Sequence, residues 1–198
     1  TPSTGGGTYW WNTGATTASI TVTPGSTTTY TCVYTLNGCP SPAGSGTVTI
    51  NPIPTVTINS ATVCAGTSAT LTATPSTGGG TYLWNTGATT ASITVTPSTT
   101  TTYTCVYTLN GCPSPAGSGT VTVNPIPTVT INSTTVCDGT SATLTATPST
   151  GGGTYLWNTG ETTASITVTP GSTTTYTCVY TLNGCPSPAG SGTVTVNP

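Results

Sequence analysis

Eight cysteines are the residues of this 198-residue chain best suited to do chemistry. Six of them stand in three identical copies of the segment TYTCVYTLNGC, at residues 29–39, 102–112 and 175–185, with two cysteines seven residues apart in each copy. The chain has no histidine and no CxxC pair, so the pattern favours disulfides over a zinc or redox site. Disulfides in turn predict a protein that lies outside the cytoplasm.

The remaining composition excludes most other chemistry. The chain has no Lys, Arg or His, and its only acidic side chains are Asp138 and Glu161. A nucleophile needs a neighbouring base and acid–base catalysis needs a titratable group, so we expect no enzyme and no catalytic residue. Nucleic acid is not an expected partner without cations to neutralise phosphates. No cofactor or metal is expected, and no apolar run approaches the roughly 20 residues that span a membrane.

The chain is a tandem array with a period of 73 residues. TPSTGGGTY recurs at residues 1, 74 and 147, and WNTG recurs at residues 11, 84 and 157. The expected modules are residues 1–53, which lack the first two strands of the repeat, residues 54–126 and residues 127–198. Asp138 and Glu161 each correspond to an alanine in the preceding module, so neither is expected to serve a function that the modules share. We expect the chain to be a piece of a longer array.

Each module is expected to be all-β, because short segments that alternate threonine with apolar residues are separated by turn residues. In residues 54–126 the expected strands are TVTIN, SATLTA, TYLWN, ASITVTP, TTYTCVYTL and SGTVTVN. Six or seven strands with a tryptophan on the third predict tandem immunoglobulin-like β-sandwich modules, and Tyr103 stands where a tyrosine corner would. The side chains expected on the buried side are Val56, Ile58, Leu71, Trp84, Ile93, Val95, Tyr103, Tyr107, Val121 and Val123.

Geometry limits the partners of these cysteines. Asn110-Gly111 predicts a two-residue hairpin that sets Leu109 opposite Cys112 and leaves Cys105 about 13 Å further along its strand. A disulfide joins Cα atoms within about 7 Å, so Cys105 and Cys112 should not pair with each other. Cys64 can serve either of them. The strand order of an immunoglobulin sandwich favours Cys105, whereas a tight hairpin at WNTGATT favours Cys112.

The two pairings have different consequences for the array. If Cys64 pairs with Cys105, Cys112 is free to bridge to a neighbouring module or chain and to make a covalent fibre. In the last module the same alternatives join Cys137 to Cys178 or to Cys185. In the first module Cys32 and Cys39 lack an in-module partner, because the counterpart of Cys64 is not part of residues 1–53.

Several segments resemble the immunoglobulin-like or PKD-like repeats of giant surface adhesins in Bacteroidota, including gliding bacteria with type IX secretion. The matching pieces are PTVTIN, TVCAGTSATLTA, YLWNTGATTASITVTP, TTTTYT, NGC and TVTVNP. The resemblance implies an extracellular, secreted stalk or fibre at the bacterial cell surface. It also implies disulfides between Cys64 and Cys112 and between Cys137 and Cys185, which leaves Cys105 and Cys178 as small buried residues. Cys105 departs from the family pattern, in which an aliphatic residue is common at that position.

We therefore expect a structural, non-catalytic repeat segment of an adhesin stalk or filament, whose partners are neighbouring copies of the same repeat or chain. One alternative is carbohydrate binding, in which an exposed Trp10 beside Tyr9 and Trp11 stacks on a surface glycan. Another is ice binding by threonine-rich faces. Trp84 is expected in the core.

Overall fold

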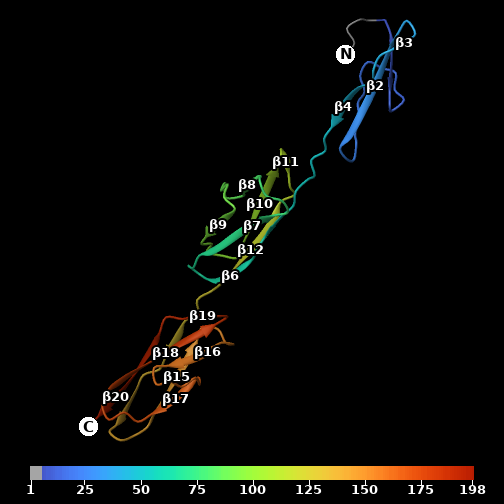
Figure 1. The fold of residues 1–198 in the computed structure, drawn as a ribbon. Coiled ribbons are helices and arrows are strands. Elements are labelled where there is room, and N and C mark those ends of the chain that lie inside the picture. The colour runs from blue at the N-terminus through green and yellow to red at the C-terminus, as the bar shows by residue number, and fades with distance from the viewer. Residues whose placement is uncertain (1–5) are drawn as a thin grey trace.

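The computed structural model describes residues 6–198, which form strands and no helix. Residues 1–5 of the expected first module lie outside the described part. Three bodies follow one another in a row, with the first and third modules at opposite ends of an elongated molecule (Figure 1). Nothing in the described part forms a helix long and apolar enough to cross a membrane.

The second module is a sandwich of two sheets. One sheet has the order β5-β7-β9, and the other contains β8, β10, β11, β12 and β6. In the second sheet β6 runs parallel to β12, whereas the other strands pair in antiparallel fashion. The strand bounds are β5 Val56–Ile58, β6 Ala61–Cys64, β7 Ala69–Pro75, β8 Thr81–Trp84, β9 Ser92–Val95, β10 Thr101–Leu109, β11 Cys112–Pro113 and β12 Gly117–Asn124.

The third module repeats this arrangement with β13 to β20. Its strands are β13 Val129–Ile131, β14 Thr134–Cys137, β15 Ala142–Pro148, β16 Thr154–Trp157, β17 Ser165–Val168, β18 Thr174–Leu182, β19 Cys185–Pro186 and β20 Gly190–Asn197. The first module has a single sheet, in which β2 Thr28–Leu36 pairs with β1 Thr8–Trp11, β3 Cys39–Pro40 and β4 Gly44–Val48. These four strands correspond in sequence to β10, β8, β11 and β12 of the second module.

The core of the second module lies between its two sheets. Leu71 and Val121 are fully buried from opposite sheets, and Trp84 and Tyr107 are nearly so. Cys105 and two alanines of β7 join the core, while Ile58, Val95 and Val123 pack at its margin. The sequence thus predicted the buried face well, because period-2 alternation puts one set of side chains on one face of a strand.

Threonine hydroxyls pair across the strands on the outer faces. The hydroxyls of Thr102 and Thr120 are 2.9 Å apart, and those of Thr72 and Ser92 are also 2.9 Å apart. Cross-strand hydroxyl pairs stabilise a sheet by about 0.2 to 1 kcal/mol each. The chain has no cationic side chains, so these hydroxyl pairs link neighbouring strands where most sheet surfaces have ion pairs.

The hairpin at Asn110-Gly111 is confirmed. Both residues have positive φ, 49° and 77°, as a type I′ turn requires, and Leu109 lies opposite Cys112. The hairpin considered at WNTGATT is wrong, because β8 pairs with β10 whereas β9 pairs with β7 in the other sheet. The segment between β8 and β9 crosses from one sheet to the other.

The tyrosine-corner hydrogen bond is made by a different tyrosine than expected. Tyr103 is buried, but its hydroxyl has no hydrogen bond among residues 6–198, whereas the hydroxyl of Tyr107 accepts a 2.6 Å hydrogen bond from the backbone N–H of Gly80. This bond ties the start of β8 to β10. The third module repeats it between Tyr180 and Gly153.

We expect Tyr107→Phe to destabilise the second module by about 1 to 2 kcal/mol, since it leaves the Gly80 N–H without its acceptor. The matched control is Tyr103→Phe, which removes a hydroxyl that makes no such bond and should cost well under 1 kcal/mol. Calorimetry of the 198-residue chain with each variant measures the difference. Equal destabilisation by the two variants would contradict this assignment.

Candidate functional site at the module junction

The parallel pairing of β6 with β12 carries Cys64 to the end of the second module where the chain leaves it. The register pairs Cys64 with Asn124, the last residue of β12, and the Ala65 N–H donates a 2.9 Å hydrogen bond to the Asn124 carbonyl. Two strands therefore end side by side at the junction. One continues into the linker, and the other presents a thiol.

The hairpin of the third module meets this end of the second. Cys185 forms a disulfide with Cys64, with the Cα atoms 5.5 Å apart, across a sequence separation of 121 residues. Asn124 Nδ2 also donates a 3.2 Å hydrogen bond to the carbonyl of Asn183 in the hairpin turn. We call this arrangement the junction staple. Closing a loop of this length stabilises the folded chain by about 5 kcal/mol in the chain-entropy description.

The linker beside the staple is short. Pro125, Ile126 and Pro127 lie between Asn124, the end of β12, and Thr128, whose N–H already donates to Ser149 Oγ in the third module. Each proline fixes its own φ near −65° and restricts the residue before it. A stiff peptide connection and a disulfide thus join the same two modules in parallel.

The in-module disulfides that the family resemblance implied are wrong for this structure. Cys64 pairs with Cys185 and not with Cys112, so Cys185 does not pair with Cys137. The reason is that Cys64 and Cys112 lie at opposite ends of the module. The eight residues of β12 between these ends span roughly 26 Å, far beyond the reach of a disulfide.

The pairing of Cys64 with Cys105 is also wrong, as is the corresponding pairing of Cys137 with Cys178. The strand order did place Cys64 at the end of the module where β10 begins. Cys105, however, lies in the middle of β10 opposite Trp84. Under this alternative the hairpin cysteine was free to bridge to a neighbouring module. The structure has such a bridge at Cys185, whose partner is Cys64.

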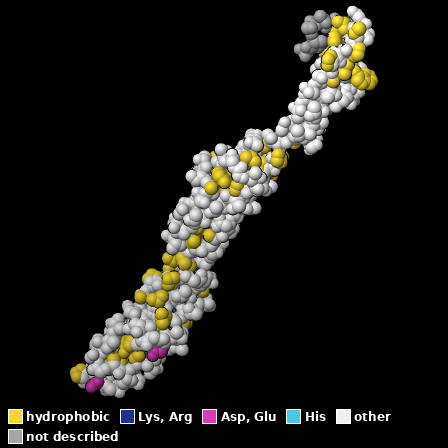
Figure 2. Space-filling view, viewed as in Figure 1, with side chains coloured by type: hydrophobic (Ala, Val, Ile, Leu, Met, Phe, Trp, Pro, Cys, Tyr) yellow, Lys and Arg dark blue, Asp and Glu magenta, His cyan; other side chains and the backbone are white. Residues whose placement is uncertain are grey.

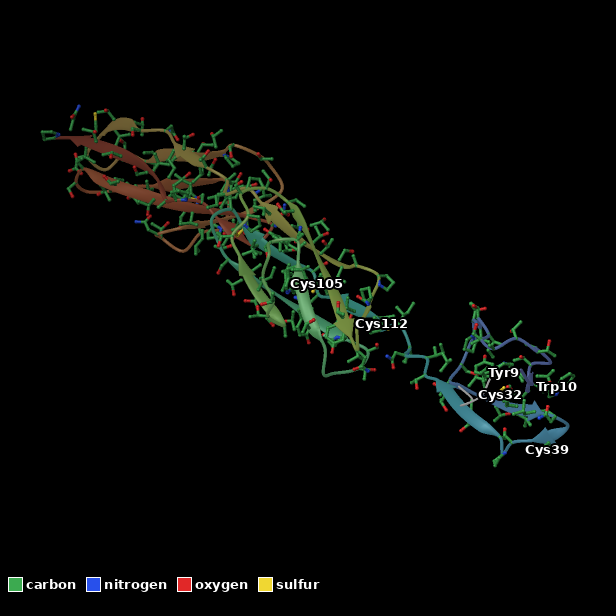
Figure 3. All side chains as sticks on the ribbon, turned by 90° about the horizontal axis from the view of Figure 1, so that it is seen from above. Tyr9, Trp10, Cys32, Cys39, Cys105 and Cys112 are labelled. Atoms are coloured by element: carbon green, nitrogen blue, oxygen red, sulfur yellow. A yellow bond between two sulfur atoms is a disulfide. The ribbon has the colours of Figure 1, made fainter. Side chains whose placement is uncertain are left out.

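The first junction has the same approach of a hairpin to the end of a strand. The Cys112 sulfur lies 4.0 Å from the carbonyl oxygen of Asn51, which is the counterpart of Asn124. Figure 3 shows Cys112 at the end of the second module that faces the first, and Cys39 at the far end of the first module. Cys39, Cys112 and Cys137 are free thiols in this structure.

Cys105 and Cys178 are core residues, as expected for small buried side chains. Each has about 1% of its surface exposed. Burial raises the pKa of the Cys105 thiol, and a hydrogen bond with the backbone of Leu83 lowers it in part. The pKa of Cys178 is raised by burial in the same way. A thiol with a raised pKa holds less of the reactive thiolate, so these cysteines serve packing.

Trp10 lies on β1 and is 61% exposed. Its counterparts Leu83 and Leu156 are each 58% exposed, so exposure is a property of this position in every module. Trp84, as expected, is in the core, and its indole N–H donates to the Thr90 carbonyl. Sugar stacking on Trp10 stays a prediction. The other two modules have leucine at this exposed position, so they do not repeat an aromatic ring there.

Solved structures with a similar arrangement are tandems of immunoglobulin domains. Titin domains I67–I69 align with 14% identity over 89% of this chain and 77% of theirs, with a TM-score of 0.50. The IG1+IG2 pair of DIP-gamma covers 74% of this chain and 99% of its own at 14% identity, with a TM-score of 0.43. The eight N-terminal immunoglobulin domains of Down Syndrome Cell Adhesion Molecule cover 96% and 36% at 13% identity, with a TM-score of 0.34.

The titin likeness bears on the fold alone, and with the strand order it confirms tandem immunoglobulin-like β-sandwich modules. No protein-family model matches the chain, and no curated protein matches it.

We expect the rate of alkylation in the native chain to separate the thiols by how deeply each one is buried. Cys32 sits in the same TCVY sequence as Cys105 and Cys178 but is only half-buried, so it should react at least about ten times faster than either. Because the three peptides are identical, the assignment uses Cys32→Ser, which should remove one thiol from the faster phase. If Cys32→Ser instead removes one thiol from the slow phase, the lower burial of Cys32 does not make it more reactive than Cys105 and Cys178.

Proposed function

We propose, from its immunoglobulin-like fold, that the chain is a non-catalytic structural segment of an extracellular stalk or filament, in which disulfides between consecutive modules carry tension. The observation that supports this most is the junction staple, because it joins neighbouring modules and not the two sheets of one module. We keep residues 1–53, 54–126 and 127–198 as the proposed modules. A bacterial surface adhesin of the resembled family is the proposed setting.

The staple changes the path of a force applied along the chain. Tension that enters the second module through β5 and β6 reaches Cys64, crosses to Cys185 and leaves along β20. The residues between Cys64 and Cys185 form a closed loop outside this path. That loop contains most of both cores, so a pull on the ends cannot extend it while the disulfide is intact.

Because the modules repeat, the other cysteines occupy equivalent positions at their own junctions. Cys112 stands at the first junction as Cys185 stands at the second, and Cys137 occupies the position of Cys64 at the end of the third module. Wherever the array continues with the same period, each hairpin cysteine faces a cysteine of the preceding module. The proposed partners are therefore neighbouring copies of the repeat.

The surface of the chain suits association better than it suits specific catalysis or nucleic-acid binding. Figure 2 shows no Lys or Arg and shows acidic groups only on the last module. Sheet edges without charged residues lack the usual protection against sideways pairing. Oxidised cysteines and a surface of this kind fit a secreted polymer outside the cytoplasm.

Single-molecule pulling of the chain from its two ends tests the mechanical role. In the oxidised chain, unfolding should leave the loop between Cys64 and Cys185 hidden, so reduction should add roughly 40 nm of contour length for its 121 residues. Cys185→Ser should show the longer length without reductant. The matched control, Cys137→Ser, alters a free thiol and should behave like the unaltered chain. Equal contour lengths with and without reductant would contradict the proposal.

The location is tested separately on cells that produce the protein. An antibody to the chain should label intact cells as strongly as permeabilised ones, because the proposed stalk lies outside the membrane. Labelling that requires permeabilisation would exclude a surface role while leaving the junction staple intact.

A further inference from the structure

Trp10 is the one aromatic side chain of residues 6–198 that lies mostly in solvent. Successive side chains of a strand point to opposite faces, so on β1 it faces away from Tyr9 and Trp11. Trp84, the counterpart of Trp11, lies in the core of the second module. Trp10 therefore lies on the outer face of its sheet. Figure 3 shows it to one side of Tyr9 and Cys32.

The exposure of Trp10 does not depend on the strands that the first module lacks. Leu156 occupies the same position in the third module, which has both sheets and a complete module before it, and it is 58% exposed. Leu83 in the second module is 58% exposed as well. A second sheet covers the inner face, which carries Trp11, and leaves the outer face open. This position is therefore exposed in complete modules too.

The side chains around Trp10 form a small uncharged surface. Trp10 lies opposite Val33 of β2, and Thr8 lies opposite Thr35. Thr31, two residues before Val33 on the same strand, shares the outer face. We call these five residues the Trp10 face. Alternate residues of a strand are about 7 Å apart and neighbouring strands about 4.8 Å, so one small ligand can contact the indole and the threonine hydroxyls together.

The polar groups of the Trp10 face have no partners within residues 6–198. The indole N–H of Trp11 donates to the Thr17 carbonyl, whereas that of Trp10 has no acceptor in the same part of the chain. The hydroxyls of Thr29 and Thr47 bond to each other at 2.8 Å, whereas those of the three threonines of the Trp10 face bond to no described residue. The face thus offers an aromatic ring with donors and acceptors beside it.

The size and the charge of the Trp10 face favour a sugar over a protein as its ligand. An aromatic side chain offers at most about 250 Å² of contact, roughly a third of the 800 Å² that each partner buries in a stable protein interface. The chain has no cationic side chain, so an anionic ligand would lose hydration without gaining a partner for its charge. A neutral pyranose packs its C–H ring face on the electron-rich face of the indole, and its hydroxyls meet the threonines.

We propose that the Trp10 face binds a neutral, β-linked polysaccharide, with one pyranose ring stacked on the indole of Trp10 and hydrogen-bonded to the neighbouring threonine hydroxyls. Trp10 projects from an outer sheet surface, so it meets a ring within a long polysaccharide as well as one at its end. Leu83 and Leu156 have no ring to stack, so the first of these three modules is the one that binds.

NMR spectroscopy of the 198-residue chain tests this proposal through the indole N–H signals of its four tryptophans. The probe is cellohexaose, a neutral oligomer of β-linked glucose. As cellohexaose is added, the Trp10 signal should shift and saturate, whereas the signals of the core residues Trp84 and Trp157 should not. The same oligomer with its primary alcohols oxidised to carboxylates should bind at least about five-fold more weakly.

The matched variant is Trp10→Leu, which gives the first module the residue that both sister modules carry at this position with similar exposure, so its fold should not change. Binding, followed by backbone amide signals around Val33, should weaken by about five- to ten-fold. Leu83→Trp should create a second site of similar affinity in the second module. There Leu83 lies opposite Val106, and the surrounding threonines are the same.

The proposal is overturned if the Trp10 signal shows no saturable shift with cellohexaose, or if Trp10→Leu binds it as well as the unaltered chain does. A Trp10 signal that shifts with protein concentration and not with the sugar would instead place a second copy of the chain on this face, and would also overturn it. None of these outcomes involves the disulfide between Cys64 and Cys185, so the proposed stalk is tested separately.

Discussion

The parallel pairing of β6 with β12 is the constraint on which the rest of the structure depends. Parallel strands end at the same edge, so this pairing sets the last residue of the module and a cysteine side by side. A Cys64 at the opposite end of the module would lie at the same end as Cys112 and away from the hairpin of the third module. Here the pairing turns Cys64 of the second module toward the hairpin of the third, and a disulfide joins these two sandwiches beside their peptide linker.

The modules fold without ion pairs between side chains, because the chain has no Lys, Arg or His. The second and third modules each have an apolar core that contains a tryptophan and two tyrosines, and hydroxyl pairs between threonines join the strands on the outside. Sandwiches of about 70 residues bury a modest share of their surface and are marginal by themselves. A bond between modules makes neighbouring sandwiches share their stability, which suits an array better than an isolated domain.

Much of the fold could be predicted from the sequence. The alternation of threonine with apolar residues gave the strands and the buried side, and Asn110-Gly111 gave the hairpin with its register. Trp84 and Cys105 lie in the core as expected. The bonding tyrosine was missed, because Tyr103 and Tyr107 are equivalent in alternation and only the position of Gly80 distinguishes them.

The junction could not be predicted, because the repeat makes the local sequences around Cys112 and Cys185 identical. Loop length does not distinguish them either, since each doubling of a loop costs only about 0.6 kcal/mol. The missing element was β6: ATVC has the alternation of a strand but only four residues. Recognising it as a strand parallel to β12 would have placed Cys64 at the exit of the module.

Mapping the disulfides of the unreduced protein tests the central claim most directly. Cleavage after Leu, Tyr and Trp leaves Cys64 in peptide 37–71, Cys112 in peptide 110–144 and Cys185 in peptide 183–198, so their masses differ even where their sequences coincide. Mass spectrometry should find peptide 37–71 joined to peptide 183–198, with fragmentation assigning the bond to Cys64. Peptide 37–71 joined through Cys64 to Cys112 of peptide 110–144 would instead show an in-module disulfide and contradict the account.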